Sequence, residues 1–589
     1  MSDIQYRLYK EAIPDCFISG TEIVMYNRGI TNIQDQKKWL NAGWESIYDW
    51  TSLAPEKMKR ACEILRDHIK QGHDVQINVD CDGDGYTSAA IIYNYLFQTF
   101  PSWTKAHLSW IHHKGKEHGL SDIMQEINSS LIICPDSSTN DIAQQKILHD
   151  NNIDCIILDH HLGEGEVNQS YATIINVQLE DYPNKSLTGA GVAYKFICAF
   201  EDLYGKGNPP TKFMDLCAVG NGADMADYRQ LEIRAIINMG FSNINNPFIY
   251  ELCQKHEYTL NKRGGINYLS MAFACFPFIN AICRTGTMED KDMVFRAMLN
   301  HFAFDEVPSS KRGDNGKLVY RYKEAVTIAE RVKRNQDKLA QESMELFDKK
   351  IQDQHLDNNA IIIITCEPDE IEGSVAGLTA NKLQAKYQHP CLVLRRSRNI
   401  DDEEDFYRGS GRNYSHCPIE NFKDMCEKTG LTEFQAGHQG AFGLGLAASK
   451  IDAFTDATND LYKGIDFTPV YWVDFIWQAN QLNKSVILEI ADLTIWGQEM
   501  PESLIAVEDI PLSEAKIDLL SPDKHPTLKI NYNDVEYIKF GYSQEEYEEL
   551  LEQDGYMTIV GVPSKNEWNG KVTPQIQITD YNIEEKWVF

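Results

Sequence analysis

Short apolar runs that alternate with helical patterns restrict the fold of this sequence more than any other feature. The first run reads VQINVD at 75–80, and similar runs follow at 108–113, 131–136, 155–159 and 173–176. Short runs rich in Ile, Val and Leu are typical of strands that are buried on both faces. An amphipathic helical pattern precedes them at 55–71, and mostly helical sequence extends from about 187 to 300. The alternation predicts an α/β domain with a parallel sheet.

A second α/β pattern follows a long charged helix that we expect at about 320–353. It contains the apolar run AIIIITCEP at 360–368, a helical stretch at 374–387 and the run PCLVLRR at 390–396. The acidic stretch DDEED at 401–405 is interpreted as a solvated loop without a function. Because 589 residues exceed what one core usually supports, we expect a second, smaller α/β domain here.

The last fifth of the chain changes to alternating strands. From about 466, strand-like runs occur at 485–496, 527–540, 556–563 and 573–583, which predicts a small β-barrel. This region has eight Lys, no Arg and 23 acidic residues, which is unfavourable for holding a polyanion by charge. We therefore expect any binding by the barrel to depend on stacking against aromatic side chains, as nucleic-acid bases do, or on protein contacts. The tryptophans available for stacking are Trp472, Trp477, Trp496 and Trp568.

The overall charge limits what the chain can bind. A net charge of -31 argues against a general polyanion binder, because phosphate contacts need Lys and Arg. The segment 311–338 is an exception, with nine basic and four acidic residues. It either guides the phosphates of a strand or is a solvated linker helix with i,i+4 charge pairs.

The sequence shows neither a membrane-spanning run nor an N-terminal signal pattern. No apolar run approaches the roughly 18 residues of a membrane helix, and the N-terminus has no basic-then-apolar signal. The 14 cysteines never form C-x-x-C, and most lie in apolar runs, which indicates reduced thiols. We expect a cytoplasmic protein without membrane contact.

The run at 75–80 leads into the acidic motif DCDGDGYTS, which resembles either a calcium loop or the corner of a hydrolase metal site. A calcium loop beginning at Asp80 needs a Glu at its twelfth position, which is Ile91, and a helix before it, where the sequence is strand-like. In open α/β sheets, ligands bind beyond the carboxyl ends of the strands. Asp80, Asp82 and Asp84 would repel one another there unless a cation neutralised them. The motif therefore predicts a metal site.

Three further segments end in acidic or imidazole side chains. LIICPD ends in Asp136, CIILDHH ends in Asp159, His160 and His161, and LCAVGNGAD, interpreted as another strand, ends in Asp224. One Asp after a strand is usually a turn or cap residue, but four such endings at one sheet edge indicate a shared site. Oxygen and imidazole ligands suit Mn²⁺ or Mg²⁺, with Fe or Zn left open, and thiolates have no part in this prediction.

These motifs are similar to those of a known family. In this order, VDCDGDGYTS, ICPDSS, LDHH and GADMAD resemble the four motifs of DHH-superfamily phosphoesterases. LTGAGVAYKF, INAICRTGT, RGSGRN, AGHQGAFGLGL and WNGKVTPQIQITD resemble the RecJ branch of that superfamily. The resemblance implies a metal-dependent 5′→3′ exonuclease that acts on single-stranded DNA.

The resemblance also implies an architecture. A parallel-sheet DHH domain is joined by a long helix to a smaller α/β DHH-associated domain, with a C-terminal OB-type β-barrel. The expected boundaries are 1–300 for the DHH domain with an N-terminal extension, 301–356 for the connecting helical segment, 357–465 for the DHH-associated domain and 466–589 for the barrel.

The site residues are carried over from the same resemblance. Two Mn²⁺ or Mg²⁺ ions would be held by Asp80, Asp82, Asp84, Asp136, His160 and Asp224. The catalytic set would be Asp136, Asp159, His160 and His161. His161 would bind phosphate or protonate a leaving oxygen, and Asp159 would orient a histidine. Some family members have a His where this sequence has Asn78, so one ion is expected to be held less tightly.

Substrate contacts are expected mainly in the second α/β domain. Arg412 and His438 resemble residues that grip phosphate, and small residues beside them let a nucleic-acid backbone come close. The further expected contacts are Ser410, Gly411, Gly437 and Arg284. The family pattern is interrupted at Asn413 and Ala436. Two ordinary explanations stay open: a buried histidine at position 438 and a surface salt bridge at position 412.

The expected reaction releases nucleoside 5′-monophosphates, in DNA repair, recombination or replication. The chain would act as a monomer on single-stranded DNA, with a single-strand-binding protein or a helicase as candidate partners. One alternative is a phosphodiesterase for short oligonucleotides or cyclic dinucleotides. Another is a catalytically inactive DHH scaffold that binds nucleic acid or replication proteins. The complete set of metal carboxylates and the C-terminal barrel favour the exonuclease.

Overall fold

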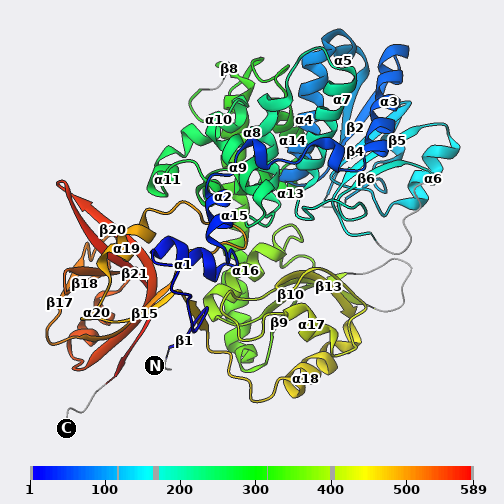
Figure 1. Cartoon of the computed structure of the whole chain (residues 1–589). Coiled ribbons are helices and arrows are strands. Elements are labelled where there is room, and N and C mark those ends of the chain that lie inside the picture. Colours follow the sequence, from blue (N-terminus) through cyan, green and yellow to red (C-terminus); the bar gives the residue numbers. More distant parts are fainter. Residues whose placement is uncertain (1–3, 116–117, 164–170, 315, 398–404, 585–589) are drawn as a thin grey trace. The chain divides into compact units, whose positions relative to one another are not determined.

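The computed structural model describes residues 4–115, 118–163, 171–314, 316–397 and 405–584 (Figure 1). The chain forms two compact units that interleave along the sequence. The parallel-sheet unit comprises Asn32–Asn335 and Thr494–Pro501. The mixed-sheet unit comprises Met1–Thr31, Gln336–Leu493 and Glu502–Phe589. The domain boundaries expected at 300, 356 and 465 remain a prediction, and most of the acidic stretch 401–405 lies outside the described residues.

The sheet of the first unit has five parallel strands, which confirms the predicted sheet. In spatial order these are β3 (Leu108–His112), β2 (Val75–Val79), β4 (Leu131–Pro135), β5 (Asp154–Asp159) and β6 (Thr173–Asn176). The chain runs from β2 outward to β3, then returns to the other side of β2 and continues outward through β6. The direction of strand order therefore reverses between β2 and β4, which is where open α/β sheets bind ligands.

Helices of this unit cover the sheet and extend beyond it. α3 (Pro55–Gln71), α4 (Gly83–Thr99), α6 (Ile142–Asp150) and α7 (Gly189–Tyr204) alternate with the strands or follow the last of them. Two short helices of this unit are α2 (Ile33–Leu40) and α5 (Pro101–His107). The later helices are α8 (Met214–Ala223), α9 (Leu231–Ser242), α10 (Pro247–Lys255), α11 (Glu257–Lys262), α12 (Tyr268–Ala274), α13 (Phe276–Thr285) and α14 (Met288–Met298).

The segment LCAVGNGAD, which we expected to be a strand, is helical. It forms α8, and Asp224 is the residue at its C-cap. A short buried apolar run has the same appearance in a helix as in a central strand, because no polar face marks its period. Here α8 needs its small residues, since a Cβ on Gly220 would come within 2.4 Å of Ala190 Cβ and 2.5 Å of Asp84 Oδ1.

The mixed-sheet unit contains the smaller α/β pattern. Its five strands, in spatial order, are β12 (Phe434–His438), β13 (Ala441–Ala447), β11 (Phe406–Arg412), β10 (Cys391–Ser397) and β9 (Ile362–Cys366). β9 and β10 are parallel, and the other pairs are antiparallel. The helices around this sheet are α16 (Ala376–Tyr387), α17 (Phe422–Glu427) and α18 (Ile451–Leu461).

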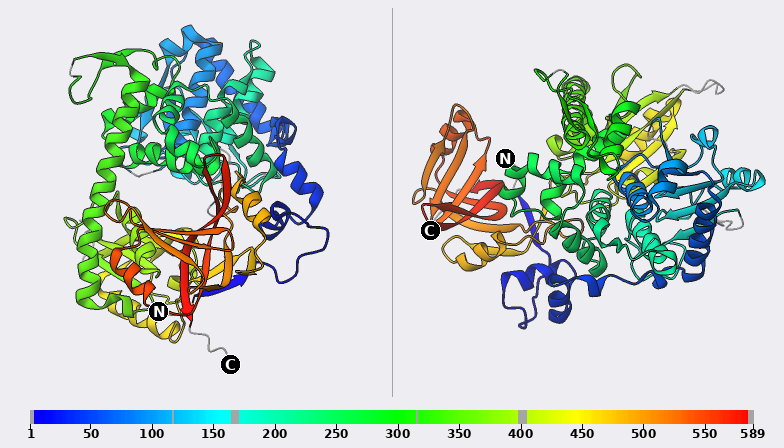
Figure 2. Two further views of the ribbon diagram at one scale, coloured as in Figure 1. Left: turned by 90° about the vertical axis from the view of Figure 1, so that its left-hand side faces the viewer. Right: turned by 90° about the horizontal axis from the view of Figure 1, so that it is seen from above.

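The predicted long helix is α15, which runs without interruption from Arg321 to Gln354 (Figure 2). The boundary between the two units falls within it. The basic segment 311–338 is not helical throughout, because its residues Leu318–Tyr320 form the short strand β8, paired with β7 (Glu306–Pro308). The chain first forms the β7–β8 pair, and helix α15 begins only after it, at Arg321.

The C-terminal region forms a seven-stranded sheet. In spatial order these are β15 (Phe475–Gln478), β16 (Ile505–Pro511), β20 (Tyr556–Trp568), β21 (Lys571–Glu584), β19 (Val535–Phe540), β18 (Thr527–Tyr532) and β17 (Lys516–Leu520). Its apolar side chains enclose a core of their own around Ile505, Leu528 and Tyr537. The remaining elements of the unit are α1 (Gly20–Asn27), α19 (Lys484–Ala491), α20 (Gln544–Leu551) and the parallel pair β1 (Gln5–Leu8) and β14 (Val470–Val473).

Two expectations about the C-terminal region are wrong. The run at 485–496 begins with helix α19 instead of a strand, because the Asn483 side chain accepts from Val486 N at 3.3 Å and caps the helix, and Ile487 and Ile490 bury one helical face. Trp496 is only 7% exposed and belongs to the parallel-sheet unit, so it cannot stack on bases. Trp568, at the tip of the long β20–β21 hairpin, is 74% exposed.

Within the described residues, no helix has the length and apolar character needed to cross a membrane. All 14 cysteines are free thiols, and 12 of them are buried, which fits the predicted absence of a disulfide framework.

A buried ion pair ties α7 to α9. Lys195 Nζ lies 2.7 Å from Glu232 Oε1, and both residues are at most 2% exposed. The same carboxylate accepts hydrogen bonds from the Tyr182 hydroxyl, Asn184 Nδ2 and the backbone N–H of Tyr48. These partners satisfy a charge that would otherwise be costly inside the protein.

We predict that Lys195→Met destabilises the chain by about 3–5 kcal/mol, because it leaves the Glu232 carboxylate buried without a cation. Lys146→Met is the matched control, since Lys146 pairs with Asp150 on the exposed surface of α6 and should matter little. Differential scanning calorimetry of the full chain in EDTA provides the comparison. Equal melting temperatures for the two variants would contradict the assigned role of the buried pair.

Candidate metal centre

The candidate centre lies at the carboxyl edge of the parallel sheet, where the strand order reverses. β2 ends at Val79 and is followed at once by Asp80, Asp82 and Asp84. Asp82 caps α4 by accepting from Asp84 N and Gly85 N, both at 3.0 Å. The cap turns the chain sharply, so that three carboxylates leave the strand within five residues. A Cβ on Gly85 would come within 2.5 Å of Asp80 Cβ, which explains the glycine in the turn.

The neighbouring strand β4 delivers Asp136. This residue has a left-handed φ of 66°, and its N–H donates to Leu158 O of β5 at 2.8 Å. The first residue of α7, Gly189, packs directly on it, because a Cβ there would lie 2.5 Å from Asp136 Cβ. The unusual backbone turn and the close approach of α7 together direct Asp136 into the site.

The structure brings all six predicted metal residues together. Donor atoms lie within 4.8 Å of one another in three overlapping groups: Asp84 with His160 and Asp224, Asp80 with Asp82 and Asp136, and Asp136 with His160 and His161. His160 Nε2 is the central atom, at 3.1 Å from Asp136 Oδ1 and 3.5 Å from Asp224 Oδ2.

The buried carboxylates repel one another strongly. Burial, followed by the charges of neighbouring acids, raises the pKa of Asp136 and of Asp224 well above the usual range. Among the described residues, Asp80 Oδ1 and Asp136 Oδ1 are buried and accept no hydrogen bond. Buried carboxylate oxygens without donors are costly unless a cation binds them. Oxygen donors with one shared imidazole fit hard divalent cations such as Mn²⁺ and Mg²⁺.

Asp84 is held by the N-terminus of α7. Its carboxylate accepts from Gly189 N at 2.7 Å, Ala190 N at 2.9 Å and Thr188 Oγ1 at 2.8 Å. These donors and the helix dipole stabilise negative charge, and they set the direction of the carboxylate. Burial nevertheless raises the pKa of Asp84, so the donors only partly offset the desolvation.

Asp159 orients His161, the second histidine of the pair. Asp159 is buried and accepts from the backbone N–H groups of Thr139, His160 and His161, and from His161 Nδ1 at 2.8 Å. Burial alone would raise the pKa of Asp159, but these bonds hold it well below its usual range. Burial would lower the pKa of His161, but the bond to Asp159 raises it to about 9. In the absence of metal ions, the bond to Asp159 therefore favours the protonated form of His161 at neutral pH.

A cavity of about 250 Å³ adjoins the metal residues. Its lining includes Asp159, His161 and the small hydroxyl side chains Ser137, Ser138 and Thr139. Hydroxyl donors and a cationic imidazole can bind an anion such as a phosphate group. Sequence reasoning missed these three hydroxyl residues, although all three follow Asp136 directly in the segment ICPDSST.

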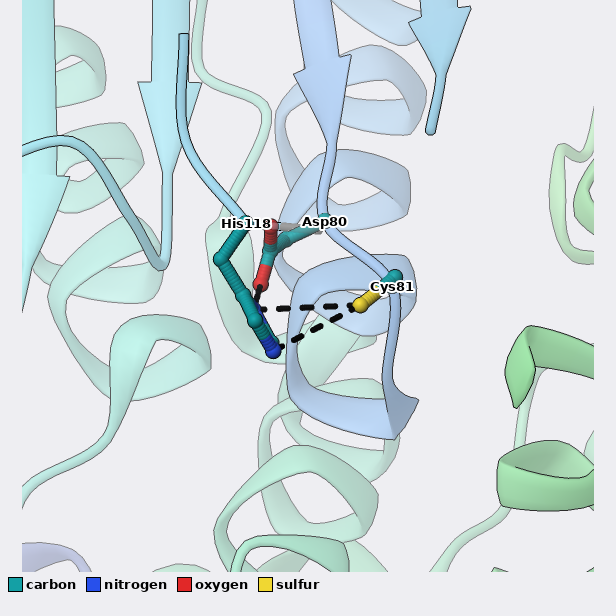
Figure 3. A group of neighbouring side chains, drawn as sticks. All are labelled: Asp80, Cys81 and His118. Atoms are coloured by element: carbon teal, nitrogen blue, oxygen red, sulfur yellow. Dashed lines mark hydrogen bonds and ion pairs between the residues drawn. The ribbon is translucent and has the colours of Figure 1, made fainter. Parts of the chain in front are cut away.

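The structure adds two residues around Asp80 (Figure 3). His118 Nδ1 lies 2.5 Å from Asp80 Oδ2, and the Cys81 Sγ is 3.6 Å from His118 Nε2. The prediction left thiols out, and the structure places Cys81 beside the carboxylates. His118 follows no strand end, so no pattern in the sequence indicated it.

The predicted substrate contacts divide between the two units. Arg284, at the end of α13, is close enough to Asp224 for its charge to lower the pKa of that acid, against the stronger effect of burial. Ser410, Gly411 and Arg412 lie on β11, whereas Gly437 and His438 lie on β12. Arg412 and His438 flank the same residue of β13, Ala441, so they share one end of that sheet. His438 is exposed, which rules out the buried histidine.

The repulsion among the acids leads to a prediction for Asp136→Asn. Removing one charge should raise the melting temperature of the metal-free chain, by roughly 2–4 °C for each kcal/mol of repulsion relieved. It should also remove most of the stabilisation that Mn²⁺ gives to the wild type. Calorimetry with EDTA and with Mn²⁺ tests both effects. Asp227→Asn is the control, because Asp227 is paired with Arg229 and should keep the Mn²⁺ response. An unchanged Mn²⁺ response in Asp136→Asn would contradict the assignment.

A pH dependence follows from the Asp159–His161 pair. The pKa of His161 in the folded chain, about 9, is above its unfolded value near 6.5. Its stabilising contribution is therefore complete below pH 6.5 and is lost as the pH rises through about 9. Asp159→Asn should lower the pKa of His161 and flatten the loss of stability between pH 7 and 9.5. NMR titration of labelled histidine, with His161→Gln for assignment, reads out the pKa. A value still near 9 in Asp159→Asn would refute the pairing.

Comparison with known proteins agrees with this geometry. The family model described as "DHH family, N-terminal domain" matches residues 74–221, and the "RecJ OB domain" model matches residues 473–580. The chain is 32% identical over 566 residues to the putative SPbeta prophage-derived single-strand DNA-specific exonuclease YorK of Bacillus subtilis, with 95% of each chain covered. It is 23% identical to the single-stranded-DNA-specific exonuclease RecJ of B. subtilis, over 96% of this chain and 68% of that protein.

The fold also matches a solved structure. The crystal structure of RecJ from Thermus thermophilus in complex with Mn²⁺ superposes with a TM-score of 0.70 at 18% identity. The match covers 99% of this chain and 79% of that one. The relative that is 32% identical covers nearly the whole chain, and both family models match the domains in which the converging carboxylates and the C-terminal sheet are found. The chain therefore belongs to the RecJ branch of the DHH phosphoesterase family.

Proposed function

We propose that this chain is a metal-dependent exonuclease that degrades single-stranded DNA from the 5′ end and releases nucleoside 5′-monophosphates. The observation that carries the proposal is the convergence of five carboxylates and two histidines at the switch point of the sheet, with two buried oxygens that accept no hydrogen bond among the described residues. The relatives are named for single-strand DNA-specific exonuclease activity, which gives the substrate class.

The proposed metal ligands form two groups around Asp136. Asp84, His160 and Asp224 would hold one Mn²⁺ or Mg²⁺ ion, and Asp80 with Asp82 would hold the other. When bound, such ions neutralise the phosphate and lower the pKa of a water molecule, which supplies a nucleophile at neutral pH. Asp84 keeps its direction through the N-terminus of α7, so this ligand is in place before the substrate arrives.

His161 is the proposed acid. The water oxygen attacks the phosphorus in line with the bond to the 3′ oxygen of the terminal nucleotide, and that bond breaks. Asp159 keeps His161 protonated at neutral pH, so its imidazolium can give a proton to the departing 3′ oxygen. The remaining strand then carries a new 5′-phosphate, ready for the next cycle.

Substrate binding is proposed for both units. Arg412 and His438, across β13 from each other, would contact phosphates, with Ser410, Gly411 and Gly437 allowing the backbone to approach. Arg284 would do the same beside Asp224. The acidic C-terminal sheet would contribute stacking through exposed side chains such as Trp568. The same proposal includes a cytoplasmic location and a monomeric state. It also includes a role in DNA repair, recombination or replication, with recruitment by a single-strand-binding protein or a helicase.

The test is a digest of a long single strand labelled at the 5′ or the 3′ end, with Mn²⁺ or Mg²⁺. We expect the 5′ label to appear at once as a mononucleotide, while the 3′-labelled strand shortens progressively. The Asp136→Asn variant is the negative control, and Asp227→Asn should keep full activity.

A dinucleotide substrate separates the proposal from the runner-up function. Cleavage of the dinucleotide without cleavage of the long strand would favour the short-oligonucleotide phosphodiesterase. Loss of the 3′ label first would reverse the proposed polarity. No cleavage of either substrate would support the inactive scaffold.

A further inference from the structure

Asp80 stands at the centre of a second donor cluster, on the side of the candidate centre formed by the segment after β3 (Figure 3). The Asp80 carboxylate is fully buried, and the Cys81 thiol is 4% exposed. His118 Nδ1 lies 2.5 Å from Asp80 Oδ2, and the Cys81 Sγ lies 3.6 and 3.8 Å from the two ring nitrogens of His118. The cluster thus offers oxygen, sulfur and nitrogen donors.

An independent observation comes from His113, which follows β3. Its side chain is fully buried, and Asp122 holds its Nδ1 at 2.7 Å. Within the described part of the chain, His113 Nε2 and Asp80 Oδ1 make no hydrogen bond, although these two atoms are only 3.4 Å apart. Metal-binding histidines commonly have one ring nitrogen held by a carboxylate, which leaves the other nitrogen free to face the ion. His113 has this arrangement, with Asp122 at Nδ1 and the buried Asp80 oxygen facing Nε2.

The distances suit a transition-metal ion. Donor atoms that bind one ion at about 2.0–2.3 Å lie roughly 3–4 Å from one another. The separations of Cys81 from His118 and of His113 from Asp80 fall in this range. Only the 2.5 Å contact between His118 and Asp80 is shorter, and it would open by about 1 Å. The His118 side chain is 53% exposed, so it has room to move outward.

We propose that Cys81 and His118 complete, with Asp80, a binding site for a first-row transition-metal ion, while His113 lies beside the other oxygen of the Asp80 carboxylate. Nitrogen and sulfur donors favour Co²⁺ or Zn²⁺, whereas Mg²⁺ and Mn²⁺ are better suited by oxygen ligands. The proposal deepens the proposed function, because Asp80 is shared with the carboxylate group that would hold an ion of the nuclease. The two groups give the edge of one sheet an oxygen-rich side and a nitrogen- and sulfur-rich side.

Co²⁺ is the probe, because a bound thiolate gives a sulfur-to-cobalt charge-transfer band that carboxylates and imidazoles do not. The full chain is titrated with Co²⁺ and followed by absorption, with and without excess Mg²⁺. We expect the band in the wild type, its persistence in Mg²⁺ and its loss in Cys81→Ser. His118→Gln should weaken Co²⁺ binding at least tenfold.

Two matched variants control for indirect effects. Cys62→Ser changes another buried thiol of the same unit, on α3. His107→Gln changes another histidine bonded to an aspartate, with 2.9 Å between His107 Nδ1 and Asp74 Oδ1, at the opposite end of β2. Both should keep the band and the wild-type affinity.

The outcomes separate this inference from the proposed nuclease. A band that survives in Cys81→Ser, or Co²⁺ binding that His118→Gln leaves unchanged, overturns the site and leaves a plain hydrogen bond between His118 and Asp80. If the wild type degrades DNA under those conditions, the nuclease stands alone. If the band behaves as expected but no substrate is cleaved, the metal site stands and the proposed function falls.

Discussion

Mutual repulsion among buried carboxylates is the constraint around which the parallel-sheet unit is organised. Asp80 and Asp136 follow the neighbouring strands β2 and β4, and Asp84 lies in the first turn of α4. Desolvation and like charge both oppose ionisation of these three acids. The fold withstands this repulsion because α7 directs backbone N–H groups at Asp84 and packs Gly189 against Asp136. The repulsion among these carboxylates lowers the stability of the metal-free unit, and bound cations relieve it. Such a loss of stability is common at functional sites.

The histidines near this edge have different tasks because their partners differ. His160 Nε2 lies among the carboxylates of Asp84 and Asp136, as suits a shared metal ligand. His161 is fixed by Asp159, and this bond favours its protonated form, as suits an acid or a phosphate contact. His113 and His118 approach Asp80 from the other side and add nitrogen donors there. One sheet edge therefore offers donors of graded hardness, which lets it discriminate between ions.

Particular residues show how far the sequence could be interpreted. The helix at 55–71 and the long helix from 321 follow from hydrophobic periodicity, since each is long enough to have one explanation. The five parallel strands follow from runs rich in Ile, Val and Leu that alternate with helical segments. α8 and α19 were expected to be strands, because a short run rich in apolar residues has no distinguishing period when most of it is buried. Trp496 appeared available for stacking, but burial is a property of packing that a sequence pattern does not record.

The sequence by itself determined the strand-ending acids, the two histidines after β5 and the order of the motifs, because parallel strands carry their carboxyl ends to one edge wherever they fall in the sequence. Only the tertiary structure decided that Asp159 serves His161 and that His118 reaches Asp80. These pairings depend on side-chain directions and on a segment 38 residues away in the chain. Local patterns encode strands and turns, whereas contacts across a site arise from packing of the whole unit.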